Sequence, residues 1–439
     1  MHKKRETPRK TSVRCHLPTP PSTHTYTPHM EATATIFRDA AVAAGVVWAS
    51  GAMVPTATHP VPFAKCAYAK ALAPLLGELV ARACVATEWL HDTLRDAAAA
   101  DAHVLFLLRT RRPQRRYMAF LRSDYMMAED AVQLCQVELN TMSCAFAALS
   151  TRVGALHGVP NGALDGLCGA IADAHRDAVE GALAPTHAVV VMVVREEEAN
   201  VCDQQLVVDG LVRRGVPCVR RTLRALRRAS TPRDGGALVL EDGQWASVVY
   251  FRACYDAWEH AEDWQREVRA TIERSGAVKC PCMDVELVGT KKVQQALAAP
   301  GGVERFLAPT EAARVRRTFV GLWAAEALPD AVRAAVHADP CAYVLKPQRE
   351  GGGNNLHGAA ILEALAGPGA AQYVLMERIR PPPCAERVTV VDMDGARTLC
   401  HPVAELGVFS TLAFAHQDAL AITRNEGVGW LLRVKEASE

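Results

Sequence analysis

A glycine-rich segment in the C-terminal part of the chain has the composition of a phosphate-binding loop. Residues 344–358 read VLKPQREGGGNNLHG, with three consecutive glycines between a strand-like and a helix-like stretch. Glycines let backbone N–H groups approach phosphate oxygens without a Cβ atom in the way. Lys346 can neutralise phosphate charge, while Glu350, Asn354 and Asn355 offer the oxygen ligands that magnesium prefers. This combination favours a nucleotide-phosphate loop over a plain flexible surface loop.

A separate segment, QVELN, could complete a magnesium site. Glu138 and Asn140 are two positions apart in it, which places both side chains on one face of an extended segment. Two ligands of one magnesium ion require that arrangement. Half-exposed strands show polar residues at this spacing routinely, so a structural role for the pair stays open. The glycine-rich loop itself is neither GxxxxGK[ST] nor GxGxxG, so the sequence supports neither a P-loop NTPase nor a Rossmann dehydrogenase.

A parallel sheet is expected in the middle of the chain. Residues 187–194, HAVVVMVV, form the continuous apolar run that is typical of a strand buried on both faces. A helix over residues 203–214, ended by Gly215, and a strand over residues 216–219 would complete a βαβ unit. The sheet is therefore predicted to be at least partly parallel.

The same sheet should present polar residues at one edge. The dipeptide at residues 242–243, Asp-Gly, predicts a hairpin between strands over residues 237–240 and 246–251. Arg252 and Tyr255 follow the second of these strands. Ligands of open α/β sheets bind outside the carboxyl ends of the strands, so these two residues are candidates for substrate binding.

Helices and further strands surround these units. The apolar spacing over residues 63–101 predicts helix, and residues 117–121 look like a strand that ends at Arg122. The arginine-rich run over residues 109–116 has no interleaved aromatic residues, so a solvated loop is favoured over a nucleic-acid patch. In the last unit we expect strands over residues 343–346, 373–377 and 387–391, and a helix over residues 356–365.

Composition narrows the class of protein. The chain has 439 residues, half of them hydrophobic, and 49 basic against 48 acidic residues, which gives a net charge of +1. This is a globular protein with no overall field for nucleic acid or an anionic membrane. Its 14 cysteines contain no CxxC pair, so reduced, mostly buried thiols are favoured, with zinc at Cys280 and Cys282 as the alternative. The uncharged stretch over residues 40–64 is too poor in large apolar residues for a membrane helix.

The N-terminal residues 1–30 are predicted to be a disordered basic tail. They carry six basic residues against the single acid Glu6, with Pro, Thr and Ser but no apolar periodicity. An organelle transit peptide is the alternative, since such segments are basic and rich in serine. Met30 could equally be the initiating residue.

The motifs together resemble eukaryotic glutathione synthetase. The matching stretches occur in the family's order and cover roughly residues 62–435: LRSDYM at 121–126, QVELNTMS at 136–143, CDQ at 202–204, VVYFR at 248–252, GTKKVQQ at 289–295, VLKPQREGGGNNL at 344–356, YVLMERI at 373–379, AELGVF at 404–409 and VGWLLR at 428–433. The resemblance implies a circularly permuted ATP-grasp fold, a homodimer, and ligation of γ-glutamylcysteine to glycine at the expense of ATP with Mg²⁺.

The resemblance also implies roles for individual residues. Magnesium would be bound by Glu138, Asn140 and Glu350. The nucleotide would contact Glu138, Lys291, Lys346, Pro347, Gln348, Arg349, Glu350, Gly351, Gly352, Gly353, Asn354, Asn355, His357, Met376, Glu377, Arg378, Ile379, Glu405 and Lys435. The peptide substrates would contact Arg122, Met142, Ser143, Cys144, Ala145, Glu198, Ala199, Asn200, Gln204, Arg252, Tyr255 and Arg433. Catalysis would rest on charge stabilisation by Arg433, Lys346 and Lys291.

The expected fold class is α/β, a circularly permuted ATP-grasp fold with a helical N-terminal region, a partly parallel substrate-binding sheet and a lid subdomain. The helical region and the first part of the core would occupy residues 31–185. The parallel-sheet subdomain would occupy residues 186–280, and the rest of the core with the glycine-rich lid residues 281–439. We expect a cytoplasmic protein, with organelle targeting by the basic tail as the alternative.

Several positions depart from the family's pattern. Ser143-Cys144-Ala145 stands where the family has SxS, and YFRACY, with Ala253 and Cys254, stands where it has YFRDGY. His357 replaces an expected tyrosine. Family members continue past LLR-x-K into a glycine- and alanine-rich loop, whereas this sequence ends at Glu439, so we expect the lid over the acceptor amino acid to be missing. A truncated, weakly active or inactive paralogue that binds nucleotide or dipeptide, or a homoglutathione-type ligase, therefore stays as an alternative.

Overall fold

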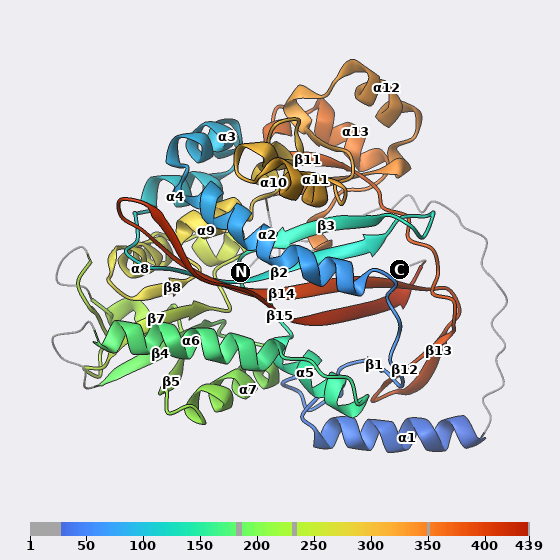
Figure 1. Ribbon diagram of the computed structural model, residues 1–439, viewed down its shortest axis with the longest axis horizontal. Helices are drawn as coiled ribbons and strands as arrows, with labels where there is room; N and C mark the ends of the chain where they lie inside the picture. Colours follow the sequence, from blue (N-terminus) through green and yellow to red (C-terminus); the bar gives the residue numbers. More distant parts are fainter. Residues whose placement is uncertain (1–27, 181–186, 231–234, 349–351, 438–439) are drawn as a thin grey trace, which may run out of the picture.

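The chain folds into several β-sheets with helices packed over and between them. The computed structural model describes residues 28–180, 187–230, 235–348 and 352–437 (Figure 1). The central sheet is antiparallel and has the strand order β15-β14-β2-β3. Its strands are β2 (Tyr117–Met127), β3 (Leu134–Asn140), β14 (Pro402–His416) and β15 (Leu420–Glu436). The long pair β14–β15 brings the C-terminal segment beside β2 from the first third of the chain.

Each face of the central sheet packs against a different layer of helices. Leu121 and Val408 point to one face, where they join a core with α2 (Cys66–Val85) and α9 (Met283–Val288). Phe120 and Phe409 point to the other face, where they join a core with α5 (Ala147–Leu156), α6 (Ala163–Glu180) and the parallel sheet. Side chains alternate along a strand, so Arg122 and Asp124 share the face of Phe120. That face is therefore apolar at one end and polar at the other.

The predicted parallel sheet is confirmed. It has the order β5-β4-β7-β6 with β8 beside β7, and only the β6–β7 pair is antiparallel. Its strands are β4 (Ala188–Val194), β5 (Cys218–Thr222), β6 (Leu238–Val239), β7 (Trp245–Phe251) and β8 (Val278–Cys280). All residues of β4 are buried, as its apolar run predicted. The helix α7 (Val201–Val212) links β4 to β5, and Gly215 then adopts φ +72°, which suits glycine.

A third sheet carries the glycine-rich loop. It has the antiparallel order β10-β11-β9, with β9 (Leu322–Ala324), β10 (Tyr343–Pro347) and β11 (Tyr373–Glu377). The helices α12 (Asp330–Ala338) and α13 (Ala359–Ala366) pack on it. The helix expected from residue 356 starts only at Ala359, because Leu356 forms a β-bridge with Leu345 instead. We call this sheet with its two helices the lid subdomain (Figure 1).

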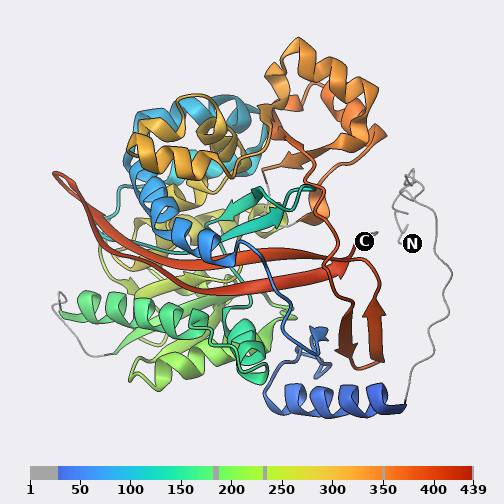
Figure 2. The same ribbon diagram turned by 45° about the vertical axis from the view of Figure 1, so that its right-hand side comes forward.

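A small sheet and one helix lie at the opposite end of the molecule from the lid subdomain (Figure 2). The sheet contains β1 (Thr56–Ala57), β12 (Val388–Asp392) and β13 (Gly395–Leu399), and α1 (Pro28–Ala43) packs against it. Because α1 begins at Pro28, residues 28–30 are helical and not part of a disordered tail as predicted. Residues 1–27 of that predicted tail lie outside the described residues.

The remaining helices are α3 (Thr87–Ala100), α4 (Ala102–Thr110), α8 (Asp263–Arg274), α10 (Lys291–Ala298) and α11 (Pro309–Arg316). The helical prediction for residues 63–101 is thus confirmed. The predicted strand end at Arg122 is wrong, because β2 continues to Met127 and pairs with β3 throughout this extension. The arginine-rich loop starts after Thr110, later than predicted, because Arg109 belongs to α4. Within the described residues, no helix has the length and apolar character to cross a membrane.

The close contact between α6 and β15 gives a test of the packing. A Cβ atom added to Gly166 would lie 2.5 Å from Val428 Cγ1, whereas one added to Gly169 in the same helix would meet nothing within 4 Å. Gly166→Ala should therefore lower the free energy of unfolding by about 1–3 kcal/mol through overpacking. Gly169→Ala should raise it by roughly 0.5–1 kcal/mol, because alanine favours a helix interior. Urea unfolding of both variants measures this, and equal effects would contradict the packing.

Candidate active site

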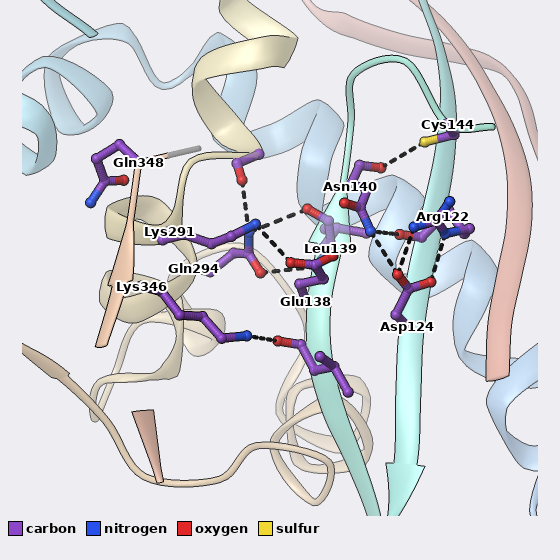
Figure 3. A network of polar contacts seen from close by, with 12 residues as sticks. Arg122, Asp124, Glu138, Leu139, Asn140, Cys144, Lys291, Gln294, Lys346 and Gln348 are labelled. Carbon is purple, nitrogen blue, oxygen red and sulfur yellow. Dashed lines mark hydrogen bonds and ion pairs between the residues drawn. The ribbon is translucent and has the colours of Figure 1, made fainter. Parts of the chain in front are cut away.

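A buried carboxylate organises the polar end of the central sheet. Asp124 on β2 is completely buried, and Arg122 donates to it twice, from Nε to Oδ1 at 2.8 Å and from Nη2 to Oδ2 at 2.9 Å. Asn140 on β3 donates from Nδ2 at 3.0 Å, and Arg433 on β15 donates from Nη2 at 2.9 Å. Arg433 also pairs with Glu405 on β14. All four strands thus contribute to one charged cluster, part of which is shown in Figure 3.

A second group of charges adjoins this cluster. Glu138 on β3 forms an ion pair with Lys291 at 3.1 Å. Lys346 on β10 is almost fully buried and donates from Nζ to the carbonyl oxygen of Val137 at 2.9 Å. Burial alone would raise the pKa of Glu138, but Lys291 and Lys346 hold it well below its ordinary value. Burial lowers the pKa of Lys346, opposed by the attraction of Glu138. Figure 3 shows both lysines approaching β3 from the same side.

Lys291 is placed by the local structure of GTKKVQQ. Thr290 caps α10, so Lys291 is the first residue of that helix. Gln294 then joins the helix to β3: it accepts from the Leu139 N–H at 2.8 Å and donates to the carbonyl oxygens of Leu139 and Gly289 at 3.2 and 2.7 Å. A Cβ on Gly289 would collide with Thr141. These contacts fix the start of α10 against the strand that carries Glu138.

The base of the glycine-rich loop is closed. Leu345 and Leu356 exchange backbone hydrogen bonds of 3.1 and 2.9 Å across it. Gln348 accepts from the Lys292 N–H at 2.9 Å and donates to the Gln372 carbonyl oxygen at 3.4 Å, so its side chain anchors the loop to α10. A short 3-10 turn covers Gly352–Asn354. The expected phosphate and magnesium ligands Arg349, Glu350 and Gly351 lie outside the described residues.

Other residues expected beside the nucleotide lie around the lid subdomain. Partial burial lowers the pKa of His357, and the charges of Arg378, Lys435 and Lys346 lower it further. The side chain of Met376 is buried within the lid sheet. Further along this segment, Glu377 and Arg378 are exposed and Ile379 is half-buried, as are Asn355 and Pro347. Burial raises the pKa of Glu405, opposed by Arg433.

The residues expected on the substrate side are held by a second buried carboxylate. Asp203 at the start of α7 is fully buried and accepts from Arg252 Nη1 at 3.1 Å. It also accepts from the N–H groups of Phe146, Ala148 and Leu149 at 3.0, 3.0 and 3.1 Å, so it caps the start of α5. Burial would lower the pKa of Arg252, but neighbouring Tyr250 and Asp203 raise it. One carboxylate therefore couples a candidate substrate-binding arginine to two helices.

Side-chain contacts hold the substrate-side candidates Gln204, Glu198 and Asn200 in place. Gln204 is fully buried, donates to Glu198 Oε2 at 2.6 Å and accepts from Arg220 at 2.8 Å. Glu198 Oε1 accepts from the Asn200 N–H at 2.8 Å, which folds the segment back on itself around the exposed Ala199. The ring of Tyr255 lies 4.2 Å below the Arg195 guanidinium. These groups surround the carboxyl ends of β4 and β7, as expected for a ligand site of an α/β sheet.

The substrate-loop candidates differ in where their side chains lie. Ser143 adopts φ +52°, the left-handed region, and is half-buried together with Ala145. Cys144 points into the core, where its Sγ donates to the Asn140 carbonyl oxygen at 3.4 Å. Met142 is buried beside a cavity of about 30 Å³ that it shares with Tyr255, Lys291 and Gln348. Residues expected on the nucleotide side and residues expected on the substrate side therefore line the same cavity.

Several buried polar atoms at this site have no hydrogen-bond partner among the described residues. They include Asn200 Oδ1, Arg252 Nε and Arg433 Nε. Buried polar groups are almost always paired, so these unpaired atoms are candidates for contact with a ligand. A larger hollow of about 650 Å³ lies between α4 and α8. It shares no lining residue with the charged cluster, so its size alone does not identify the active site.

Two residues of this site were missed as individual candidates. Asp124 and Asp203 lay inside the quoted motifs LRSDYM and CDQ, but no role was assigned to them. Each is a fully buried aspartate, and buried carboxylates are nearly always paired. The available signals were an aspartate two positions from an arginine within a mostly apolar strand, and an aspartate in the first turn of a helix.

An enzyme that activates a carboxylate with ATP needs positive charge to bind phosphates and arginines to bind acids. This site offers both, together with carboxylates and a glycine-rich loop. The site and the mixed α/β fold define an ATP-dependent ligase. The sequence model of the eukaryotic glutathione synthase ATP-binding domain matches residues 41–439. The chain belongs to the eukaryotic glutathione synthase family.

Individual relatives agree with this assignment. The chain is 33% identical to the chloroplastic glutathione synthetase of Solanum lycopersicum, with 88% of this chain and 74% of that protein aligned. It is 33% identical to the glutathione synthetase of Xenopus laevis over 89% of this chain and 86% of that protein. It is 34% identical to the human glutathione synthetase over 73% of this chain and 70% of that protein.

A solved structure shares the fold. It is a glutathione synthetase-like effector, GSS30, from Globodera pallida in its apo form, with a TM-score of 0.73 and 20% sequence identity. The similarity covers 94% of this chain and 96% of the effector. At this identity the comparison supports the fold alone.

The Glu138 ion pair gives a pH-dependent test. Glu138→Gln should lower the free energy of unfolding at pH 7 by about 3 kcal/mol, because it removes a buried carboxylate charge that attracts both Lys291 and Lys346. The pKa of Glu138 is lower in the folded state than its ordinary 4.5. Its stabilisation is therefore complete above about pH 4.5 and declines as the pH falls towards the folded-state pKa.

Urea unfolding between pH 3 and pH 7 measures the difference between Glu138→Gln and the unmodified protein. The difference should shrink below about pH 4.5. Glu304→Gln serves as the control, because Glu304 is in an exposed pair with Arg316 and should cost only about 0–1 kcal/mol. A difference that stays constant with pH would show that the carboxylate charge of Glu138 is not its source.

Proposed function

We propose that this protein is a glutathione synthetase, which ligates γ-L-glutamyl-L-cysteine and glycine and converts ATP to ADP and phosphate. Family membership supports the reaction, since the aligned relatives carry that name over most of the chain. The observation that carries the proposal most is the meeting of Lys291, Lys346 and Glu138 from three distant segments next to the Asp124 cluster. Lysines that can bind phosphates therefore lie beside arginines that can bind carboxylates.

The chemistry proceeds in two steps that need no nucleophile from the protein. An oxygen of the cysteinyl carboxylate attacks the γ-phosphorus of ATP, the bond to the β-phosphate oxygen breaks, and ADP leaves. The glycine amine then attacks the carbonyl carbon of the acyl phosphate. Collapse of the tetrahedral intermediate releases phosphate and forms the amide, and the amine proton passes to phosphate or solvent. Lys291, Lys346 and Arg433 would stabilise the negative charge that develops on the transferred group.

The arginines of the site suit the acidic dipeptide. γ-Glutamylcysteine carries two carboxylates, and a guanidinium binds a carboxylate through two parallel hydrogen bonds. The contacts of Arg122 with Asp124 use Nε and Nη2, and that of Arg252 with Asp203 uses Nη1. We assign the remaining donors of both arginines, with Arg433, to the substrate side. Ser143, Gln204 and Tyr255 would complete the peptide site.

The described residues fit a magnesium site. Glu138 offers a carboxylate, and both hydrogen bonds of the Asn140 side chain use Nδ2, which leaves its carbonyl oxygen for a cation. Magnesium is commonly bound by one or two carboxylates together with substrate phosphates. A bound Mg²⁺ would neutralise phosphate charge. Glu350 would be the third protein ligand by the family's pattern.

The architecture, assembly and location are also proposals. The central sheet and the lid subdomain would form the circularly permuted ATP-grasp core, and the parallel sheet over residues 186–280 the substrate-binding subdomain. The Gly351–Gly353 segment, with Asn354 and Asn355, would cover the phosphates. We propose a homodimer in the cytoplasm, with organelle targeting as the alternative that the chloroplastic relatives support.

Turnover tests the proposed function directly. The purified protein should release ADP only when γ-glutamylcysteine, glycine, ATP and Mg²⁺ are all present, with glutathione formed in equal amount. Lys346→Ala should lower turnover by about a hundred- to a thousandfold, because it removes one group that stabilises the transferred phosphate. Lys70→Ala should leave turnover unchanged, since Lys70 is exposed over Trp430. ADP release that does not depend on the dipeptide would contradict the proposal, and preference for β-alanine would reassign the acceptor.

A further inference from the structure

We infer that Asp124 is a positioning residue that sets the orientation and spacing of Arg122 and Arg433 for the dipeptide. The inference rests on the proposed function for the identity of the substrate. None of the roles derived from the family's pattern includes Asp124. It would contact neither ATP nor dipeptide and would act only through the two arginines and Asn140.

Protein groups make four hydrogen bonds to the Asp124 carboxylate. Oδ1 accepts one hydrogen bond from Arg122, and Oδ2 accepts one each from Arg122, Asn140 and Arg433, all between 2.8 and 3.0 Å. Each carboxylate oxygen offers about two acceptor sites, so Oδ2 is crowded with donors, while Oδ1 has one donor and lies against the backbone of Gly407. A completely buried carboxylate held in this way is poorly placed to act as a general base or metal ligand. The position of Asp124 therefore indicates that it orients its hydrogen-bond partners.

Electrostatics explain why a charged residue is needed. Burial alone would lower the pKa of Arg122, and the attraction of Asp124 raises it above the ordinary value. Arg433 has Glu405 as a second carboxylate, so two carboxylates offset two guanidinium groups before substrate arrives. Without Asp124, buried Arg122 would lose its paired carboxylate, Arg433 would keep only Glu405, and the two guanidinium groups would repel one another. Each would then be free to adopt other rotamers.

Packing explains why the position of the carboxylate is fixed. Asp124 pairs with Gly407 on β14, and a Cβ atom on residue 407 would lie 2.8 Å from Asp124 Oδ1 and 2.9 Å from Arg122 Cδ. The carboxylate therefore lies directly against backbone, and a glycine is required opposite it. Asn140 donates from its nitrogen on the other side of the carboxylate. Asp124 has no space to shift, so its partners take their positions from it.

Asp124→Asn tests the inference with little change in shape. Dipeptide affinity, measured by calorimetry on the protein alone, should fall about tenfold or more, and kcat/KM for the dipeptide about a hundredfold, because a buried charge-assisted contact is lost on each arginine. ATP affinity without magnesium should change less than about threefold. Lys291 pairs with Glu138 and Lys346 donates to the Val137 carbonyl oxygen, so neither of these contacts involves Asp124. Circular dichroism and urea unfolding establish that the variant is folded.

Glu273→Gln is the matched control. Glu273 is likewise a fully buried carboxylate paired with an arginine, Arg269, but it lies away from the charged cluster. It should lose stability on the scale of Asp124→Asn while keeping the dipeptide affinity within about threefold. The inference is overturned, and Asp124 is merely structural, if Asp124→Asn lowers the affinities for ATP and dipeptide equally. The same holds if Asp124→Asn lowers neither affinity.

If Asp124→Asn does not fold, Asp124→Glu replaces it: the charge is kept, but one methylene moves the carboxylate against Gly407. Loss of dipeptide affinity with intact ATP affinity in this variant supports positioning, and unchanged dipeptide affinity overturns it. If the unmodified protein binds dipeptide but forms no glutathione, the proposed function fails, while the calorimetric comparison still tests Asp124.

Discussion

The completely buried carboxylate of Asp124 accepts hydrogen bonds from Arg122, Asn140 and Arg433, which arise from β2, β3 and β15. Burying an unpaired charge costs several kcal/mol, so the three donors must all be present in the folded chain. That condition specifies the register of the polar end of the central sheet, since a shift by one residue would turn these side chains to the other face. The candidate active site therefore depends on the alignment of these three strands around one carboxylate.

Asp203 has a corresponding role in the parallel sheet. It holds Arg252 and caps α5 with three backbone N–H contacts, so a single side chain joins the start of α7, the end of β7 and the segment after Ser143. Both aspartates thus use one negative charge to place an arginine whose remaining donors are available to an acidic ligand. Preorganised arginines lose little further entropy when a carboxylate binds. This arrangement suits a substrate with two carboxylates.

The proposed nucleotide side combines two lysines with a carboxylate. Lys291 and Lys346 lie close enough to Glu138 to lower its pKa, and the proximity of Lys291 contributes to lowering the pKa of Lys346. Two buried lysines on one side of Glu138 suit the negative charge of a phosphate. The lid subdomain supplies Lys346, and α10 supplies Lys291, so the two lysines meet only when the lid sheet packs against β3. Cavity space of about 30 Å³ beside Lys291 indicates a compact site in this conformation.

The sequence by itself determined the local elements and the chemical type of the site. The apolar run of β4, the Asp-Gly hairpin and the glycine-rich loop each follow from short-range rules, because backbone preferences and side-chain periodicity act within a few residues. Residue order and motif spacing also identified the family. Only the tertiary structure decided that β2 extends to Met127, that Leu356 joins Leu345 in place of a helix, and that Asp124 and Asp203 organise the arginines. The first two features depend on backbone pairing across a loop, with β3 and with Leu345. The two aspartates depend on contacts between segments far apart in the chain, whose energies arise only when burial removes water from the charges.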